Sequence, residues 1–207
     1  MRVDIITVGA LFVNCYIISK NNEAIIIDPG SDFDKIKEFI ISNSLKPLAI
    51  LNTHGHFDHV GAIEDIKNEF KISLYMHKDD EFLLRNASQH AMMFGLNEVK
   101  TSNIDYYIDN GEKLTFGDIK IEVIHTPGHS PGGVCFYIKE LNSVFTGDTL
   151  FYESVGRTDF SYADFNKLKK SIQQKLYSLN SETKVFPGHG PSTSIGYERK
   201  MNAFVKA

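Results

Sequence analysis

Cysteine, long apolar segments and blocks of basic residues are all scarce in this sequence. The two cysteines, Cys15 and Cys135, lie far apart along the chain, and without a secretion signal such cysteines are expected to be reduced, buried thiols. The opening segment MRVDIITVGA carries charge early and has no long apolar run, which argues against a signal peptide or a membrane span. We therefore expect a soluble cytoplasmic protein with no membrane partner.

The charge balance is nearly even, with 22 basic and 26 acidic residues and a net charge of −4. Because no basic block is present, nothing in the charge pattern indicates a nucleic-acid partner. A length of 207 residues and a hydrophobic content of 42% suit one domain of ordinary size with its own core.

Short β-branched runs alternate with amphipathic segments along the chain. We expect strands at residues 3–8, 15–19, 24–28, 48–52, 72–76, 118–125, 134–139, 143–147 and 184–188. We expect helices at residues 31–45, 61–70, 78–86, 162–179 and 196–207. Asn21-Asn22 marks a turn between two strands, and Phe165, Leu168, Ile172 and Leu176 form one helix face. This alternation predicts a layered α/β protein.

The segment LNTHGHFDHVG, residues 51–61, places three histidines and an aspartate within six positions. A helix would point His54 and His56 to nearly opposite sides, because residues two apart do not share a face. The spacing instead predicts a loop that leaves a strand, with side chains aimed at one point or at two neighbouring points. Histidine and aspartate are metal ligands, so the segment predicts metal binding.

The same arrangement of strand, glycine and ligand occurs three more times. Gly128 precedes His129, Gly147 precedes Asp148, and Gly188 precedes His189. Functional groups of α/β proteins gather at strand ends, and glycine permits a sharp turn there. These side chains are therefore expected to belong to the same site as the histidine loop.

Together these segments offer seven donors, which exceed the four ligands of one tetrahedral zinc. The seven donors are His54, His56, Asp58, His59, His129, Asp148 and His189. They predict two metal ions with Asp148 as the bridge, because a carboxylate has two oxygens. Zinc is the expected metal, with iron or manganese as alternatives.

The pattern H-x-H-x-D-H, followed by a distant His, an Asp and a His, resembles the metallo-β-lactamase superfamily over nearly the whole chain. The resemblance implies an αββα sandwich, with two mixed sheets flanked by helices and the metals at one edge. It also implies a single domain over residues 1–207. The implied first metal site comprises His54, His56 and His129, and the second comprises Asp58, His59 and His189, with Asp148 bridging. Asp58 would in addition orient a metal-bound hydroxide.

Three segments resemble short bacterial proteins of the glyoxalase II, or hydroxyacylglutathione hydrolase, type: GRTDF (156–160), PGHGP (187–191) and IGYERKMNAF (195–204). The best-known group of β-lactamases carries cysteine where Asp148 stands here. The chain ends eighteen residues (207 − 189) after His189, so we expect it to lack the helical glutathione-binding domain of longer glyoxalase II enzymes. The resemblance implies hydrolysis of a small hydroxyacyl thioester by a bridging hydroxide, and thiolate is a good leaving group.

Three other functions remain as alternatives. A persulfide dioxygenase resembles this family and would use one iron, held by His54, His129 and Asp148. A lactonase or phosphodiesterase would use the same scaffold, although the charge balance disfavours a nucleic-acid substrate. A protein that only binds is disfavoured because every ligand position is present.

Further residues are assigned by their neighbourhood. Candidates for the substrate pocket are Phe12, Phe57, Met93, Phe151, Tyr152 and Arg157. Residues 86–103 form either a flap over the metals or a helix face in the core. His77 is expected to have a structural or helix-capping role, and His125 either to support the metal ligands or to end a strand. Arg157 is expected to pair with Asp159 beside the site, with contact to a substrate carboxylate as the alternative.

Overall fold

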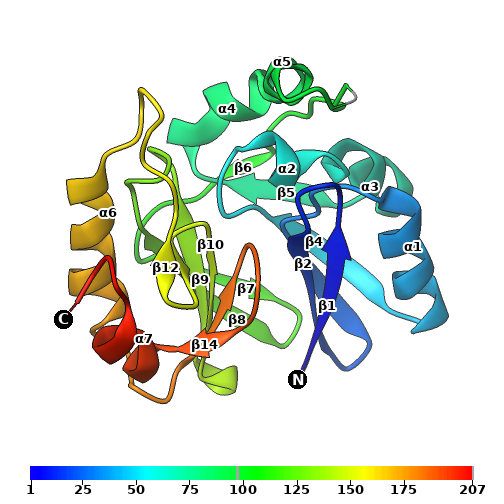
Figure 1. The fold of residues 1–207 in the computed structure, drawn as a ribbon. Coiled ribbons are helices and arrows are strands. Elements are labelled where there is room, and N and C mark those ends of the chain that lie inside the picture. The colour runs from blue at the N-terminus through cyan, green and yellow to red at the C-terminus, as the bar shows by residue number, and fades with distance from the viewer. Residues whose placement is uncertain (97, 207) are drawn as a thin grey trace. The chain divides into compact units, whose positions relative to one another are not determined.

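The computed structural model describes residues 1–96 and 98–206, and Figure 1 shows their fold. The chain forms two compact units, of which the first comprises residues 1–108 and 115–119. The second comprises residues 109–114 and the chain from residue 120 onwards.

The first unit contains a mixed six-stranded sheet in the order β1-β2-β3-β4-β5-β6. Its strands are β1 (Arg2–Val8), β2 (Val13–Lys20), β3 (Glu23–Ile27), β4 (Lys46–Leu51), β5 (Ser73–Met76) and β6 (Tyr106–Tyr107). The first three strands pair antiparallel, and β3 to β6 pair in parallel. Asn21 and Asn22 link β2 to β3 with φ of 51° and 63°, as a two-residue hairpin turn with positive φ at both positions requires. The expected turn is thus confirmed.

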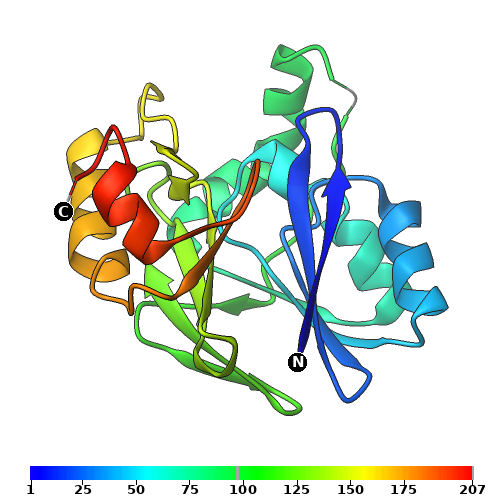
Figure 2. The same cartoon turned by 60° about the horizontal axis from the view of Figure 1, so that its bottom comes forward.

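Two helices cover one face of this sheet, and Figure 2 shows α1 (Phe33–Ser42) beside α3 (Ile63–Phe70). Their apolar faces pack with the strands in one core, because Ile36 and Ile63 join the same buried cluster as Ile17, Ile26 and Ile50. The remaining helical segments are α2 (Phe57–Val60), a 3-10 turn (Lys78–Asp80), α4 (Glu81–Arg85) and α5 (Ala87–Met93).

The second sheet has the order β14-β13-β10-β9-β8-β7. Its strands are β7 (Lys113–Phe116), β8 (Ile119–His125), β9 (Val134–Ile138), β10 (Ser143–Gly147), β13 (Lys184–Pro187) and β14 (Thr193–Ser194). Strands β10 and β13 are parallel, whereas β8-β9, β9-β10 and β13-β14 are antiparallel. A separate hairpin joins β11 (Leu150–Phe151) to β12 (Ser154–Val155). A 3-10 turn (Lys139–Leu141) follows β9.

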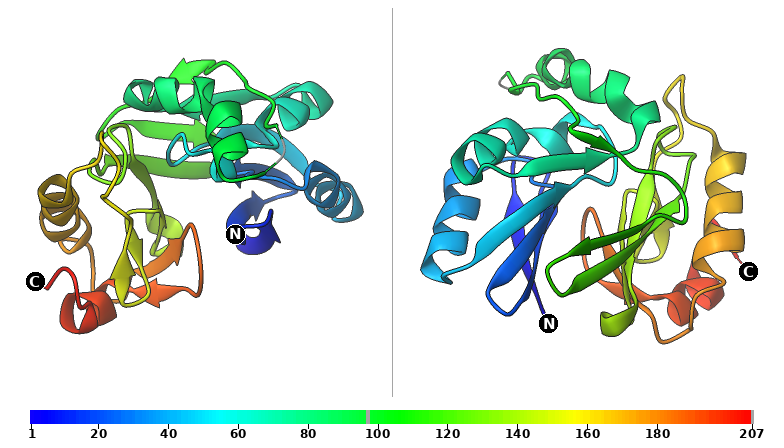
Figure 3. Two further views of the ribbon diagram at one scale, coloured as in Figure 1. Left: turned by 45° about the horizontal axis from the view of Figure 1, so that its top comes forward. Right: turned by 180° about the vertical axis from the view of Figure 1, so that it is seen from behind.

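Helix α6 (Phe165–Ser171) lies against the second sheet, as Figure 3 shows, and α7 (Ile195–Met201) follows β14. The segment expected as one helix at 162–179 consists of α6 and a π-helical turn at Ile172–Leu176. Leu168, Ile172 and Leu176 are fully buried, but Phe165 is 39% exposed. Phe165 is the first residue of α6, directly after the N-cap Asp164, so only the later three residues of the predicted face are buried.

The α/β class with two mixed, helix-flanked sheets is confirmed. Cys15 and Cys135 are both buried and free of disulfides, as the sequence predicts. No helix within residues 1–96 and 98–206 is long and apolar enough to cross a membrane.

Candidate functional site

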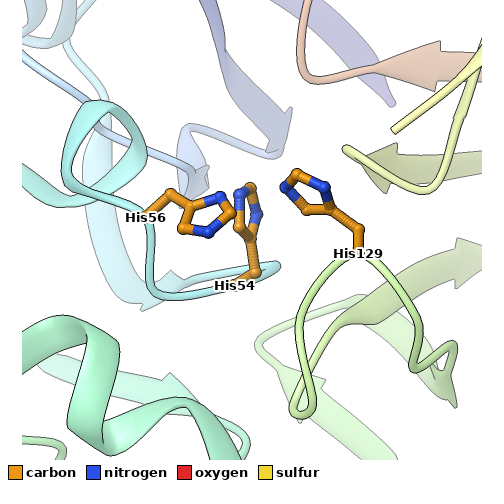
Figure 4. Close-up of side chains that lie close together, drawn as sticks. All are labelled: His54, His56 and His129. Atoms are coloured by element: carbon orange, nitrogen blue, oxygen red, sulfur yellow. The ribbon is translucent and has the colours of Figure 1, made fainter. Parts of the chain in front are cut away.

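The histidine loop of the first unit begins where β4 ends at Leu51. Figure 4 shows His54 and His56 on this loop. The ring centroid of His54 lies 4.7 Å from that of His56 and 4.2 Å from that of His59. The three imidazoles therefore lie together at the end of β4.

Asp58 and His59 lie on α2, a helix of four residues that follows His56. The sequence predicts a loop throughout this segment, and that expectation is wrong for residues 57–60. A single turn can form here because His56 has extended backbone, with φ of −67° and ψ of 145°, and its carbonyl accepts the His59 N–H at 2.9 Å. The turn places the His59 Nε2 3.6 Å from the Asp58 Oδ2.

Asp28 is the functional residue that the sequence patterns do not single out. Its side chain is buried, with 1% of the residue exposed, and it accepts hydrogen bonds from both the N–H and the hydroxyl of Thr53, at 2.7 and 2.6 Å. A third partner is the His59 Nδ1 at 3.1 Å. The only local signal is its place at the end of a strand, in Asp28-Pro29-Gly30.

These contacts determine which ring nitrogens face a metal. The Asp28 carboxylate only accepts, so the His59 Nδ1 donates and the neutral ring keeps its lone pair at Nε2. The Thr53 hydroxyl donates to Asp28 and therefore accepts from the His54 Nδ1 at 3.0 Å. His54 thus also presents Nε2, and hydrogen bonds of this kind orient metal-binding histidines. Donor atoms of Asp28, His54 and His59 lie within 4.8 Å of one another.

Two glycines allow the backbone near α2 to pack closely. A Cβ on Gly30 would lie 1.8 Å from the Asp58 carbonyl oxygen, and a Cβ on Gly61 would lie 2.4 Å from the Gly30 carbonyl oxygen. The Gly61 N–H donates to that Gly30 oxygen at 2.9 Å. Only residues without a Cβ permit this approach, so the two glycines fix the position of Asp58 and His59.

The second unit supplies His129 on the loop after β8, labelled in Figure 4. Its Nδ1 lies 2.8 Å from the Arg157 carbonyl oxygen. Because a carbonyl only accepts, Nδ1 carries the hydrogen and Nε2 keeps the lone pair. Gly128 before it has φ of 145°, and a Cβ there would lie 2.2 Å from the Leu168 nitrogen. The glycine thus allows the ligand loop to contact α6.

Asp148 follows β10 and lies between two histidines. Its Oδ2 is 3.6 Å from the His129 Nε2 and 3.7 Å from the His189 Nε2. Two ligands of one tetrahedral zinc, at bond lengths of about 2.0–2.1 Å, lie roughly 3.3 Å apart. The lone pair at the His129 Nε2 faces the Asp148 carboxylate, which is also an acceptor. A cation between the two atoms would make this contact favourable. These three residues fit a metal site.

The C-terminal helix α7 holds the hairpin that follows Asp148. The buried Glu198 carboxylate accepts from the Thr193 hydroxyl at 2.6 Å, the Glu153 N–H at 3.0 Å and the Asn202 amide at 2.9 Å. The Asn202 amide also donates to the Ser154 carbonyl at 3.1 Å. These bonds explain what the segment IGYERKMNAF does in this chain. It anchors β11 and β12, the hairpin that leads from Asp148 towards Arg157.

The pocket candidates of the first unit differ in exposure. Phe57 is 8% exposed and its ring centroid lies 5.3 Å from that of Phe94, at the end of α5. Met93 is 77% exposed and Phe12 is 71% exposed. The expected flap at 86–103 includes residue 97, which lies outside the described residues. The alternative expectation of a core-facing helix fails for Met93, because the buried side of α5 consists of alanines.

The pocket candidates of the second unit differ in their contacts. The Phe151 ring lies 6.2 Å from that of His189 in an edge-on contact. Tyr152 is 44% exposed and stacks on Tyr197 at 5.4 Å. Arg157 makes the expected ion pair with Asp159 at 2.8 Å, and this hydrogen bond raises the pKa of Arg157. Its backbone carbonyl accepts the hydrogen bond that orients His129.

Two further histidines have structural partners. The His77 Nδ1 accepts the Asp79 N–H at 3.2 Å and caps the 3-10 turn, as expected. His125 ends β8, as the sequence predicts, and its Nε2 lies 2.9 Å from the Pro131 carbonyl oxygen.

Comparison with known proteins identifies the family. The family model described as Metallo-beta-lactamase superfamily matches residues 8–189. Probable metallo-hydrolase YqgX of Bacillus subtilis is 38% identical over 200 residues, which cover 96% of this chain and 94% of that protein. Hydroxyacylglutathione hydrolase GloC of Haemophilus influenzae is 36% identical over 210 residues, which cover 100% of this chain and 99% of that protein.

Solved structures agree with this match. The BLEG-1 B3 metallo-beta-lactamase is 36% identical and has a TM-score of 0.94, with 100% of both chains covered. TTHA1623 in a di-iron-bound form is 40% identical and has a TM-score of 0.91, with 98% of this chain and 100% of that chain covered. This chain belongs to the metallo-beta-lactamase superfamily and has the metallo-beta-lactamase fold.

Proposed function

We propose that the protein is a dinuclear metal-dependent hydrolase of small hydroxyacyl thioesters. The observation that carries the proposal is the set of oriented donors. The His59 and His129 rings donate from Nδ1 and present Nε2 beside a carboxylate, at 3.6 Å from Asp58 and from Asp148 respectively. In each pair an imidazole lone pair faces a carboxylate oxygen, and these two acceptors repel each other unless a cation lies between them. The pairs therefore favour a protein that binds metal.

The ligands are assigned as the family motif implies. His54, His56 and His129 would hold one ion, and Asp58, His59 and His189 would hold the other, with Asp148 shared between the two. The position of the Asp148 Oδ2, at nearly equal distances from the Nε2 atoms of His129 and His189, supports its bridging role. Zinc suits this donor set, and iron or manganese would also bind it.

When bound, two such ions lower the pKa of water and polarise a carbonyl oxygen. The chain's own contribution is positioning. Asp28 and the Arg157 carbonyl set the tautomers of the ligand rings. The Asp58 carboxylate accepts a hydrogen bond from the attacking water and so orients it towards the acyl carbon.

The choice of a thioester rests on the relative GloC, which carries the name hydroxyacylglutathione hydrolase and aligns over 99% of its own length. A β-lactam is the second candidate substrate, because BLEG-1, which is 36% identical, is named a B3 metallo-beta-lactamase. A one-iron persulfide dioxygenase, a lactonase and a phosphodiesterase are the remaining alternatives.

Metal analysis and a substrate screen test this proposal. Purified protein loaded with zinc, iron or manganese should hold close to two ions per chain, measured by elemental analysis. It should then release thiol from S-lactoylglutathione faster than it opens a β-lactam, a lactone or a phosphodiester. One iron per chain with oxygen uptake from a persulfide would replace the hydrolase by the dioxygenase. Two ions with turnover of only a non-thioester would keep the metal assignment and reject the substrate.

The metal assignment has its own readout. Cobalt in place of zinc gives visible bands that depend on ligand number and type. His56→Ala and His189→Ala should each change a different part of that spectrum and lower the metal content by one ion. His90→Ala, a change in an α5 histidine outside the ligand set, should leave both unchanged. Loss of both ions from the His90 variant would contradict the assignment.

A further inference from the structure

The first unit contains a pocket of about 320 Å³ beside Asp58. Its apolar lining comes from the β1-β2 hairpin, from α2, and from α5 and the residues that follow it. The larger apolar side chains are Val8, Leu11, Val13, Phe57, Leu96 and Val99. The volume is at the lower end of the range for small-molecule sites. The pocket therefore fits a small group.

The charged lining of this pocket has one sign. Asp32 and Glu98 line it together with Asp58, and none of its described lining residues is basic. Ser31 adds a hydroxyl. A carboxylate placed in this pocket would meet like charges and gain no cation, whereas an aliphatic chain gains apolar contact.

The walls of the pocket are held in place before any ligand arrives. The Asp32 carboxylate accepts the Gly9 N–H at 3.0 Å and thereby ties the β1-β2 hairpin to the start of α1. Within the hairpin, the Phe12 N–H donates to the Gly9 carbonyl at 3.2 Å. On the other side, Phe57 packs against Phe94 at 5.3 Å and so holds α5. A preformed pocket binds a small group without an ordering cost.

We propose that this pocket binds the acyl group of the substrate, and that it selects a short, uncharged aliphatic chain with or without a hydroxyl. The proposal rests on the proposed function, because Asp58 is one of the assigned ligands and the pocket lies beside it. The carboxylates of Asp32 and Glu98 accept a hydrogen bond from an acyl hydroxyl but repel a carboxylate terminus. The thiol part of the substrate lies outside this pocket.

A second hollow in the first unit provides a contrast. It has a volume of about 450 Å³ and is lined by Ile5, Thr7, Lys35 and Glu38 among others. It contains a lysine and none of the assigned metal ligands. Because a carboxylate in this hollow has a cation available, binding there would show the opposite charge preference.

The first test compares acyl chains on one thiol. Acetyl, butyryl, hexanoyl and succinyl thioesters of N-acetylcysteamine are hydrolysed by the zinc-loaded protein. The value of kcat/KM should rise about threefold to fourfold for each methylene that enters the pocket. The succinyl ester should be at least about tenfold slower than the butyryl ester. Equal rates for butyryl and succinyl esters would overturn the proposal.

Variants of pocket residues test whether the acyl-chain preference arises in this pocket. Val99→Trp should fill the pocket and remove the gain from butyryl to hexanoyl, with little change for acetyl. Glu98→Gln should raise the succinyl rate relative to butyryl about threefold. Glu38→Gln, the same change at the second hollow, should leave both ratios unchanged. A Val99→Trp variant that keeps the chain-length gain would show that the acyl group binds elsewhere.

A binding measurement separates failure of this proposal from failure of the proposed function. The metal-free protein is titrated with butyramide and with butyrate while backbone amide resonances are followed by NMR. Butyramide should shift the amides of Val8, Leu11 and Val99, and butyrate should shift them much less. If no thioester is hydrolysed but butyramide binds there, the proposed function fails and the pocket stands. If thioesters are hydrolysed but butyramide shifts other amides, the pocket assignment fails alone.

Discussion

Replacing Asp28 by alanine is expected to lower the free energy of unfolding by about 3 kcal/mol. The carboxylate is 1% exposed and accepts three hydrogen bonds, two from Thr53 and one from His59. A buried donor left without its acceptor costs about 1–3 kcal/mol. We take the lower end for each of the three donors, because the space vacated by the carboxylate admits a water molecule.

The Asp28→Asn variant separates stability from metal binding. Its amide oxygen still accepts one hydrogen bond, but its NH2 group faces the His59 Nδ1–H, a second donor. The His59 ring must then turn or change tautomer, and loss of such an orienting partner lowers metal affinity about 10–100-fold. The change in unfolding free energy should be smaller than for alanine, at about 1–2 kcal/mol.

Two measurements check these values. Zinc affinity is obtained by competition with a chromophoric chelator, and stability by urea unfolding of the metal-free protein followed by circular dichroism, since the chain has no tryptophan. Asp34→Asn, in the exposed first turn of α1, is the matched control and should change either quantity by less than about 1 kcal/mol. Asp28→Asn with wild-type zinc affinity would refute the role assigned to the Asp28 hydrogen bonds.

Three further outcomes are expected. Asp148→Ala should reduce the metal content more than His129→Ala does, because it removes a ligand from both ions; equal two-metal occupancy in the Asp148 variant, by elemental analysis, would argue against the bridge. Gly30→Ala should lower the free energy of unfolding by about 3 kcal/mol in urea unfolding, because its Cβ would lie 1.8 Å from a carbonyl oxygen. The control is Gly95→Ala, which has open space around it. It should lower the free energy of unfolding by only about 1 kcal/mol, because of its positive φ. Glu198→Ala should cost about 3 kcal/mol through three lost hydrogen bonds, and Glu198→Gln clearly less; similar losses in both variants would show that shape rather than hydrogen bonding matters there.

Local patterns predicted the parts of this protein that depend on near neighbours. The Asn21-Asn22 turn follows from the residues that tolerate positive φ. The loop that carries His54 and His56 follows from a spacing that no helix satisfies. Such features need no knowledge of distant residues, so the sequence alone reveals them.

Features that depend on distant partners were not predictable in this way. Asp28 is bound to Thr53 and His59, which lie 25 and 31 residues away, and no periodicity marks such contacts. Glu198 looks like a surface residue of an amphipathic helix, yet it is buried by partners from the β11-β12 hairpin. Helix α2 has only four residues, which is too short for a helical pattern to be recognised.

The packing of Gly30 against Gly61 has a consequence for protein engineering. The close approach of the two glycines holds the backbone that carries Asp58 and His59, while the side chains of Phe57 and Val60 anchor the same turn in the core. A designer who wishes to change the metal preference would therefore keep Phe57 and Val60 and exchange His59 together with its partner Asp28. Loop grafts that insert a larger residue at either glycine would instead displace Asp58 and His59 together.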